Sequence, residues 1–305
     1  MSLSTTLSTL RLVSRIYTKS PSTIFSLIVI TLYTVGALAT VLGLVPPLPP
    51  AKGGWEYIYQ PPSARDFPWY ILGTDFTGRP LLLAIVRGIS TTLAVAFLSA
   101  VITVTIGVAL GLISGYLGGI VDEIFSIIIN VALTIPTYLL ALILVATLPA
   151  ELKTNILVLA GILSITAWAS LARAVRAQTL SLRKREFIDV AKTLGFSAWK
   201  IMFDEILRFM APFIAMSLTL AMCNAVYGYT GLAFLGLMPI SSENWGIQIY
   251  MAIRAGGALY SDRAILALWS PIITIVLLQY ALINIAKTME AIFNPALRVS
   301  YIKGE

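Results

Sequence analysis

The chain has no histidine and a single cysteine, Cys223, among its 305 residues. These absences exclude a His-based catalytic or metal site, an intrachain disulfide and a Cys-type metal site. Charge is also scarce, because only 11% of the residues are Asp, Glu, Lys or Arg, whereas a soluble domain carries roughly 25%. The sequence Gly-x-x-x-x-Gly-Lys-Ser/Thr is absent too, so the chain has no phosphate-binding loop for ATP of that type. A soluble enzyme is therefore not expected.

Apolar residues are correspondingly abundant in the chain. They make up 58% of the chain, and the mean hydropathy is +0.89. Long uncharged runs approach or exceed the roughly 20 residues that cross a bilayer, and they fall within 21–51, 88–121, 124–150, 154–172, 209–242 and 264–286. The pattern predicts an all-α polytopic membrane protein with six transmembrane helices. A re-entrant piece at 231–242 would change the count to five or seven.

The distribution of Lys and Arg predicts that both termini are cytoplasmic. With the N-terminus inside, 14 of the 21 basic residues lie on the cytoplasmic side. The net charge of +7 is then explained by this bias and by anionic lipid, without nucleic acid. The first span is expected to stay uncleaved, because its apolar run is too long for a signal peptide and prolines follow it.

This orientation divides the chain into segments. The predicted segments are a cytoplasmic N-terminal segment (1–22), a first transmembrane anchor helix (23–45), an external loop (46–88), a five-helix core (89–290) and a cytoplasmic tail (291–305). The core contains a cytoplasmic loop at 174–208 and an external loop at 231–262. Aromatic residues in the first external loop are typical of an interfacial belt, with a ligand-binding box as the alternative.

A charged amphipathic stretch at 186–207 interrupts the apolar core. Apolar residues spaced as on one helix face are Phe187, Val190, Ala191 and Leu194. Gly195 suits the left-handed residue that ends a helix, and Ser197 can cap a second helix that carries Trp199. We expect a helix, a tight corner and another helix. The stretch is a handle for a soluble partner, a helix that lies on lipid headgroups, or an ordinary linker.

Small and polar residues mark the spans. A four-residue repeat predicts a helix face that allows close packing with this chain or a partner, and it comprises Gly107, Gly111, Gly115 and Gly119. Polar candidates for a translocation path are Asn130, Thr134, Asn224 and Tyr227. These four, like Gln279 and Asn284, can instead bridge helices. Pro136 and Pro271 favour kinks.

The amphipathic stretch also resembles a family signature. Permease subunits of ABC importers carry Glu-Ala-Ala, three residues, Gly, nine residues and Ile-x-Leu-Pro in a cytoplasmic loop. The corresponding residues here are Asp189-Val190-Ala191, Gly195 and Glu205-Ile206-Leu207-Arg208. Asp189 and Val190 replace Glu and Ala, while Glu205 and Arg208 replace Ile and Pro.

Three further segments resemble the dipeptide/oligopeptide/nickel branch of these permeases, in the same order. Residues 72–79 match Leu-Gly-Thr-Asp-x-x-Gly-Arg, with Pro80 in place of an acidic residue, and Asp75 and Arg79 can pair if this piece is helical. Residues 231–237 followed by 244–246 match a Phe-Leu-Gly-Leu run and a Trp-Gly pair. Residues 294–298 match Asp-Pro-x-x-Arg, with Asn294 for Asp.

The resemblance implies a permease subunit that is not catalytic by itself. Its implied partners are a second homologous permease, two ABC ATPase subunits, an external substrate-binding protein and membrane lipid. ATP and Mg²⁺ would bind to the ATPase subunits, and this chain would bind no cofactor. The residues that the resemblance and the helix pattern assign to ATPase coupling are Glu186, Phe187, Asp189, Val190, Ala191, Leu194, Gly195 and Trp199.

The cargo implied by the resemblance is a peptide, with an oligosaccharide or a nickel chelate as alternatives. A channel or secondary carrier is a more remote alternative, and the absence of acidic and basic residues from the span centres argues against proton coupling. A membrane enzyme would need paired acids or a nucleophile–base pair in the spans, which the sequence does not show. A structural scaffold would leave the ordered motifs unexplained.

Overall fold

The computed structural model describes residues 20–293 except 53, 55, 65–66, 241–242 and 261. The helices in this part of the chain are α2 (Pro21–Val41), α3 (Leu81–Leu117), α4 (Gly119–Thr134), α5 (Thr137–Thr147), α6 (Ile156–Ser164), α7 (Trp168–Leu182), α8 (Glu186–Thr193), α9 (Ala198–Lys200), α10 (Leu207–Phe234), α11 (Trp245–Arg254) and α12 (Ile265–Phe293). No strand occurs among the described residues, which confirms the all-α class. The motif at 294–298, most of the segment 1–22 and the end of the tail 291–305 lie outside them.

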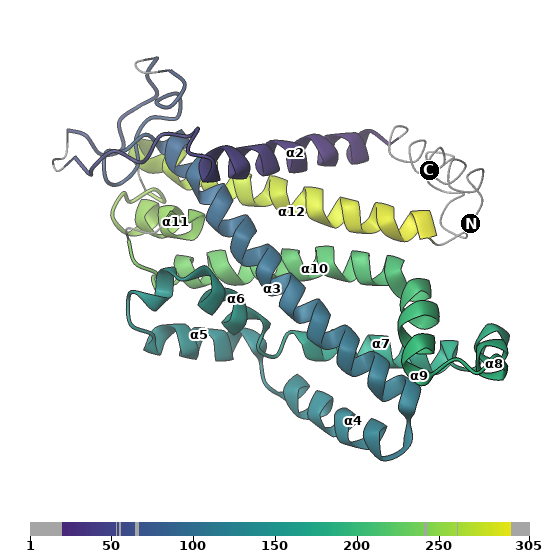
Figure 1. Cartoon of the computed structure of the whole chain (residues 1–305). Helices are drawn as coiled ribbons and strands as arrows, with labels where there is room; N and C mark the ends of the chain where they lie inside the picture. Colours follow the sequence, from purple (N-terminus) through teal and green to yellow (C-terminus); the bar gives the residue numbers. More distant parts are fainter. Residues whose placement is uncertain are drawn as a thin grey trace.

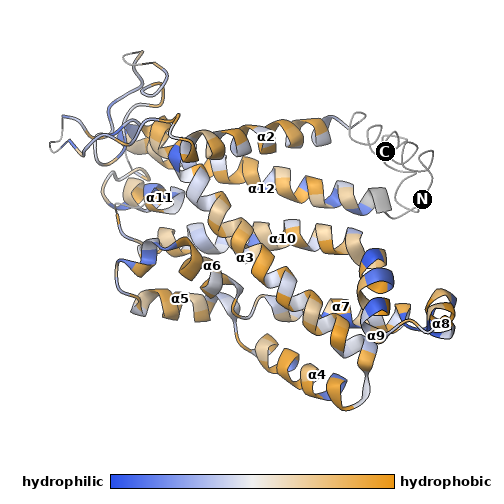
Figure 2. Cartoon of the chain, in the orientation of Figure 1, coloured by the Kyte–Doolittle hydropathy of each residue, from blue (hydrophilic) through white to orange (hydrophobic). Residues whose placement is uncertain are grey.

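Apolar composition makes these helices candidates for membrane crossing (Figure 2). Four of the described helical stretches are long and apolar enough as single units, and they are α2, α3, α9 to α10, and the stretch that ends in α12. Two bent pairs pass the same test, namely α4 with α5 and α6 with α7. The described chain therefore has four candidate spans, or up to six if each bent pair crosses as one unit.

The helices are arranged around α3, which runs diagonally across the others (Figure 1). α3 packs against α7 and α10, while α12 packs against α2 and α10. The start of α2 and the end of α12 lie on the side of α8, and the loop before α3 lies with α11 on the opposite side (Figure 1). We call these sides the α8 end and the α11 end. They carry segments that the sequence assigned to opposite sides of the membrane.

Both bent pairs break at the same place in the fold. α4 and α5 meet at 70° across Ile135 and Pro136, and α6 and α7 meet at 53°. The hydroxyls of Thr137 and Thr166, one from each break, are 2.8 Å apart. Pro136 thus ends a helix, as its missing N–H favours. Pro271 does not, because α12 continues past it as one helix.

The glycine repeat mediates contact within this chain. A Cβ atom on Gly111 would lie 2.5 Å from the Ala172 carbonyl of α7, and one on Gly115 would lie 2.8 Å from the Arg176 carbonyl. Gly107 faces the same helix. Gly119 was wrongly included in this face, because it begins α4 after the turn at a φ of +56°, with no atom within 4 Å of a Cβ there.

The α11 end differs in detail from the sequence expectation. α10 continues to Phe234, into the range 231–262 that was assigned to an external loop. The short helix in this region is α11, which follows the stretch 231–242 rather than lying inside it. Residues 74–80 form a turn, not a helix, because Thr74 bridges to Pro80 and the Asp75 carboxylate accepts the backbone N–H of Arg79 at 3.0 Å. The expected i,i+4 side-chain pair of Asp75 and Arg79 is therefore replaced by a side-chain-to-backbone bond.

Candidate functional site

The amphipathic stretch folds as the sequence predicts, into a helix, a corner and a second helix. α8 ends at Thr193, and Gly195 two residues later has a φ of +77°, which is strained for residues with a side chain. The Ser197 hydroxyl then accepts the backbone N–H of Lys200 at 3.3 Å and caps the next helix. A π-helical turn, Ile201–Ile206, joins α9 to α10 without a break. The corner thus returns the chain directly into a candidate span.

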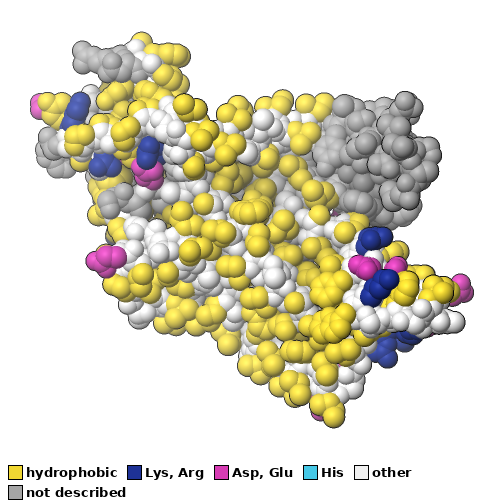
Figure 3. All heavy atoms as spheres, viewed as in Figure 1, with side chains coloured by type: hydrophobic (Ala, Val, Ile, Leu, Met, Phe, Trp, Pro, Cys, Tyr) yellow, Lys and Arg dark blue, Asp and Glu magenta, His cyan; other side chains and the backbone are white. Residues whose placement is uncertain are grey.

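α8 exposes large apolar side chains at the tip of the molecule. Phe187, Val190 and Leu194 are 37%, 57% and 66% exposed. Trp199 on the next helix is 58% exposed and stacks on Phe203 at a ring distance of 6.0 Å. Figure 3 shows hydrophobic atoms among Lys, Arg, Asp and Glu at this end. The mixture is suited to a protein surface that has an apolar centre and a charged rim.

The opposite side of α8 holds the helix to its own chain. Ile188 and Ala191 are buried with Met202 and Ile206 of the π-helical turn and with Val175 of α7. Ala191 was therefore wrongly placed on the exposed face, because the buried stripe runs through residues 188 and 191. Ile188 was missed, although its i,i+3 spacing to Ala191 is a helical signal of the same kind.

Acidic residues of α8 flank the apolar face, and Lys192 lies on the other side of the helix. Glu186 and Asp189 are exposed in the first turn, where acidic groups favour the positive end of the helix dipole. Lys192 Nζ lies 2.8 Å from Asp189 Oδ1, an exposed pair that contributes little to stability. The coupling roles assigned to these residues stay predictions.

A cavity of about 710 Å³ lies among α3, α5, α7 and α10, next to the two helix breaks. Asn224 and Tyr227, two of the four candidate path residues, line it. The remaining polar lining residues are Ser99, Thr103, Thr137, Tyr138, Ser170 and Ser217. The lining therefore has hydroxyl, amide and aromatic groups but no charged side chain. Irregular backbone beside such a cavity is typical of solute sites in membrane proteins.

The other polar residues of the spans have different surroundings. Asn130 and Thr134 are exposed on α4 and do not line the cavity. Gln279 donates to the Cys223 carbonyl at 2.9 Å, and Asn284 donates to the Ser26 hydroxyl at 2.9 Å. These two amides bridge α12 to α10 and to α2, as buried amides in a bilayer usually do.

Comparisons with known proteins fit this architecture. The family described as "Binding-protein-dependent transport system inner membrane component" matches residues 107–299. The oligopeptide transport system permease protein OppC of Mycobacterium bovis (strain ATCC BAA-935 / AF2122/97) is 31% identical over 227 residues, which cover 74% of this chain and 75% of that protein. OppC of Bacillus subtilis (strain 168) is 32% identical over 186 residues, 61% of this chain and 59% of the relative. The di/tripeptide transport system permease protein DppC of Pseudomonas aeruginosa (strain UCBPP-PA14) is 28% identical over 263 residues, 83% of this chain and 82% of the relative.

The family match covers more than half of the chain, and the first of these relatives exceeds 30% identity over about three-quarters of it. Several long apolar helices agree with a component that resides in the membrane. The chain therefore belongs to the binding-protein-dependent transport system inner membrane components, the multi-pass permease subunits of ABC importers in the cell membrane.

Proposed function

We propose that this chain and a second homologous permease form the translocation path of an ATP-driven importer for di- and oligopeptides. An external binding protein delivers the cargo. Two ATPase subunits bind the ATP and Mg²⁺, and this chain itself binds no cofactor. The names of the relatives support a peptide cargo, because two are oligopeptide permeases and one is a di/tripeptide permease.

The observation that carries the proposal is the two-sided burial of α8. Ile188 and Ala191 fix the helix to α7 and to the π-helical turn, whereas Val190 and Leu194 stay exposed. Exposed apolar residues rimmed by charge mark a protein interaction surface. Because α8 is anchored to the elements that lead into α7 and α10, a push on its exposed face is transmitted to both.

The cavity supports the cargo side of the proposal. Its lining is uncharged and contains both small hydroxyl-bearing side chains and apolar ones. Such a surface forms hydrogen bonds with peptide groups, which all peptides share, and tolerates variable side chains. A volume of about 710 Å³ lies within the usual 300–1,000 Å³ of small-molecule sites. A second permease on the open side would enlarge it.

The docking face can be tested in the importer purified from its native membrane and reconstituted in liposomes. Val190→Glu and Leu194→Glu place a carboxylate in the proposed ATPase contact, so we expect peptide uptake to fall at least roughly tenfold. ATP hydrolysis should no longer be stimulated by loaded binding protein. Thermal unfolding of the isolated chain should stay unchanged, since both side chains are exposed.

Lys192→Glu is the matched control, because Lys192 is exposed and lies on the side of α8 away from Val190. It adds negative charge to the same helix and should retain most of the uptake. Wild-type uptake in Val190→Glu and Leu194→Glu, or an equal loss in Lys192→Glu, would contradict ATPase docking on this face.

A further inference from the structure

Arg173 is an exposed cation on α7 with no ion-pair partner among the described residues. Its Nη2 donates to Asn130 Oδ1 of α4 at 2.7 Å, which is its one hydrogen bond to the described part of the chain. The guanidinium has five N–H donors, so most of them remain available. The sequence had placed Arg173 beyond the end of a span, but α7 continues through it to Leu182.

The Arg173–Asn130 pair lies at an apolar level of the fold. Asn130 is eleven residues after Gly119, which corresponds to roughly 17 Å along α4. Its neighbours Ile127, Ile128 and Val131 are exposed apolar side chains. A cation at such a level is expensive in hydrocarbon, and it is found where it faces protein or a water-filled cavity.

The cavity described above reaches the neighbours of this pair on α7, although neither Arg173 nor Asn130 is itself a lining residue. Ser170 precedes Arg173 by about one helical turn, Ala174 follows it directly, and both line the cavity. Ser170 and Arg173 are both exposed on α7. Since the lining has no Asp, Glu, Lys or Arg, Arg173 is a fixed positive charge at the rim of an otherwise neutral path.

We propose that Arg173, positioned by Asn130, binds the carboxylate of the passing solute, and that this is the C-terminal carboxylate when the cargo is a peptide. The assignment rests on the proposed function and adds a specificity residue to it. A guanidinium presents a planar fork that matches a carboxylate with two parallel hydrogen bonds. Asn130 is neutral, so it orients the fork without cancelling its charge. Because no carboxylate lines the cavity, the path offers no matching partner for the peptide ammonium group.

The test uses the whole importer, purified with its partners and reconstituted in liposomes with the binding protein outside and ATP inside. Uptake of trialanine is compared with uptake of trialanine amide. Arg173→Gln should lower the rate for trialanine roughly tenfold, the size expected for loss of a charged hydrogen bond, and should leave the amide rate within about twofold. Arg173→Lys, which keeps the charge, should retain part of the trialanine rate.

An equal loss for both peptides would overturn the proposal, because the effect of Arg173 would not depend on the substrate carboxylate. No loss for either peptide would also overturn it. If wild-type importer takes up neither peptide, the proposed function itself fails, which is a separate outcome.

A second measurement is independent of delivery by the binding protein. Cys223 is the chain's single cysteine, so Cys223→Ser with Ser170→Cys creates one reporter thiol a helical turn from Arg173. An anionic methanethiosulfonate reagent should label it several-fold faster with Arg173 than with Arg173→Gln, and a cationic reagent should show the reverse. Trialanine, but not its amide, should slow labelling when Arg173 is present. Labelling that does not depend on residue 173, or no labelling at all, contradicts a water-filled anion site here.

Discussion

At the α11 end, Trp245 is completely buried and its indole N–H donates to the Ile85 carbonyl at 3.0 Å. At the α8 end, Trp199 is 58% exposed and contacts only the ring of Phe203 among the aromatic residues described. Similar side chains thus serve packing within the chain at one end and remain available for a partner at the other. An ion pair adds to the packing within the chain at the α11 end, because Arg87 of α3 pairs at 2.6 Å with Glu243, just before α11.

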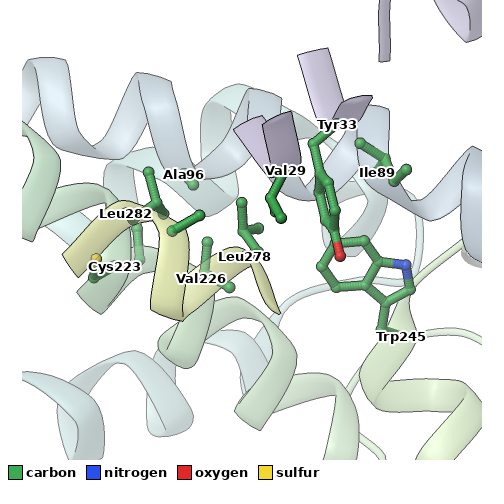
Figure 4. Packing of buried hydrophobic residues seen from close by; sticks show 11 residues of the cluster. Val29, Tyr33, Ile89, Ala96, Cys223, Val226, Trp245, Leu278 and Leu282 are labelled. Atoms are coloured by element: carbon green, nitrogen blue, oxygen red, sulfur yellow. The ribbon is translucent and has the colours of Figure 1, made fainter. Parts of the chain in front are cut away.

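If α8 docks on an ATPase subunit as proposed, the difference separates a fixed end of the chain from an end that can be moved. Trp245 meets the edge of Tyr33 on α2 and packs with Ile89 of α3, so three segments converge on it (Figure 4). α8, by contrast, is held through a short buried stripe with Ile188 at its centre. A force on α8 would therefore move the helices that it anchors before it disturbed the α11 end.

The largest effect is expected when the scaffold at the α11 end is broken. Trp245→Ala removes a fully buried indole and its hydrogen bond to the Ile85 carbonyl, so we expect a loss of about 3–5 kcal/mol of folding free energy. Trp269→Ala is the control, because Trp269 on α12 is 53% exposed and should change stability by about 0.5 kcal/mol or less. Unfolding curves of the detergent-solubilised chain measure both. Equal losses would show that Trp245 is no more structural than a surface tryptophan.

A smaller loss is expected at the α8 end. Ile188→Ala removes the buried anchor of α8 and should cost about 2–4 kcal/mol if α8 unfolds together with the rest of the chain. Val190 lies on the other side of α8 from Ile188 and is 57% exposed. Val190→Ala should therefore change the stability by no more than about 0.5 kcal/mol. Hydrogen exchange of the α8 amides distinguishes the two variants. Faster exchange confined to α8 in Ile188→Ala would show local detachment, and unchanged exchange in that variant would refute the anchoring role.

The elements that depend on residues close together in the sequence could be predicted from the sequence. The helix–corner–helix at 186–207 follows from apolar spacing, Gly195 and Ser197, and the structure has a φ of +77° at Gly195 and a capping bond at Ser197. Helicity of the apolar runs was predictable for the same reason. The buried side of α8 was not predictable from the sequence. Ala191 fits both the predicted apolar stripe and the stripe with Ile188, and the choice between them depends on Met202 and Ile206 across the corner.

The candidate path depended on contacts that are distant in the sequence. Asn224 and Tyr227 were found because amides and tyrosines stand out in an apolar span. Ser170 and Thr137 were missed, since small hydroxyl groups also bond their own helix and are unremarkable in a span. Arg173 was missed because charge was taken to end the span, whereas Asn130 of α4 gives it a partner 43 residues away.

The smallest effect concerns a single charge at the α11 end. Asp75 is buried, and its Oδ1 accepts the backbone N–H groups of Thr77 and Arg79 and the Thr77 hydroxyl. Burial raises the pKa of Asp75 above its usual 3.8. The folded chain therefore holds the Asp75 proton more tightly than the unfolded chain, and this contribution to stability is lost as the pH rises through the folded pKa.

Asp75→Asn keeps an oxygen acceptor for the turn but cannot ionise, so it lacks this pH dependence. Relative to wild type, it should gain stability as the pH rises from about 4 to about 7, by less than roughly 1 kcal/mol. Asp75→Ala loses the acceptor and should be destabilised across the whole range. Unfolding midpoints of the three chains at each pH measure the difference. If Asp75→Asn became less stable than wild type with rising pH, the turn would stabilise the carboxylate, and the α11 end would depend on a buried charge, unlike the α8 end, where the charged pair is exposed.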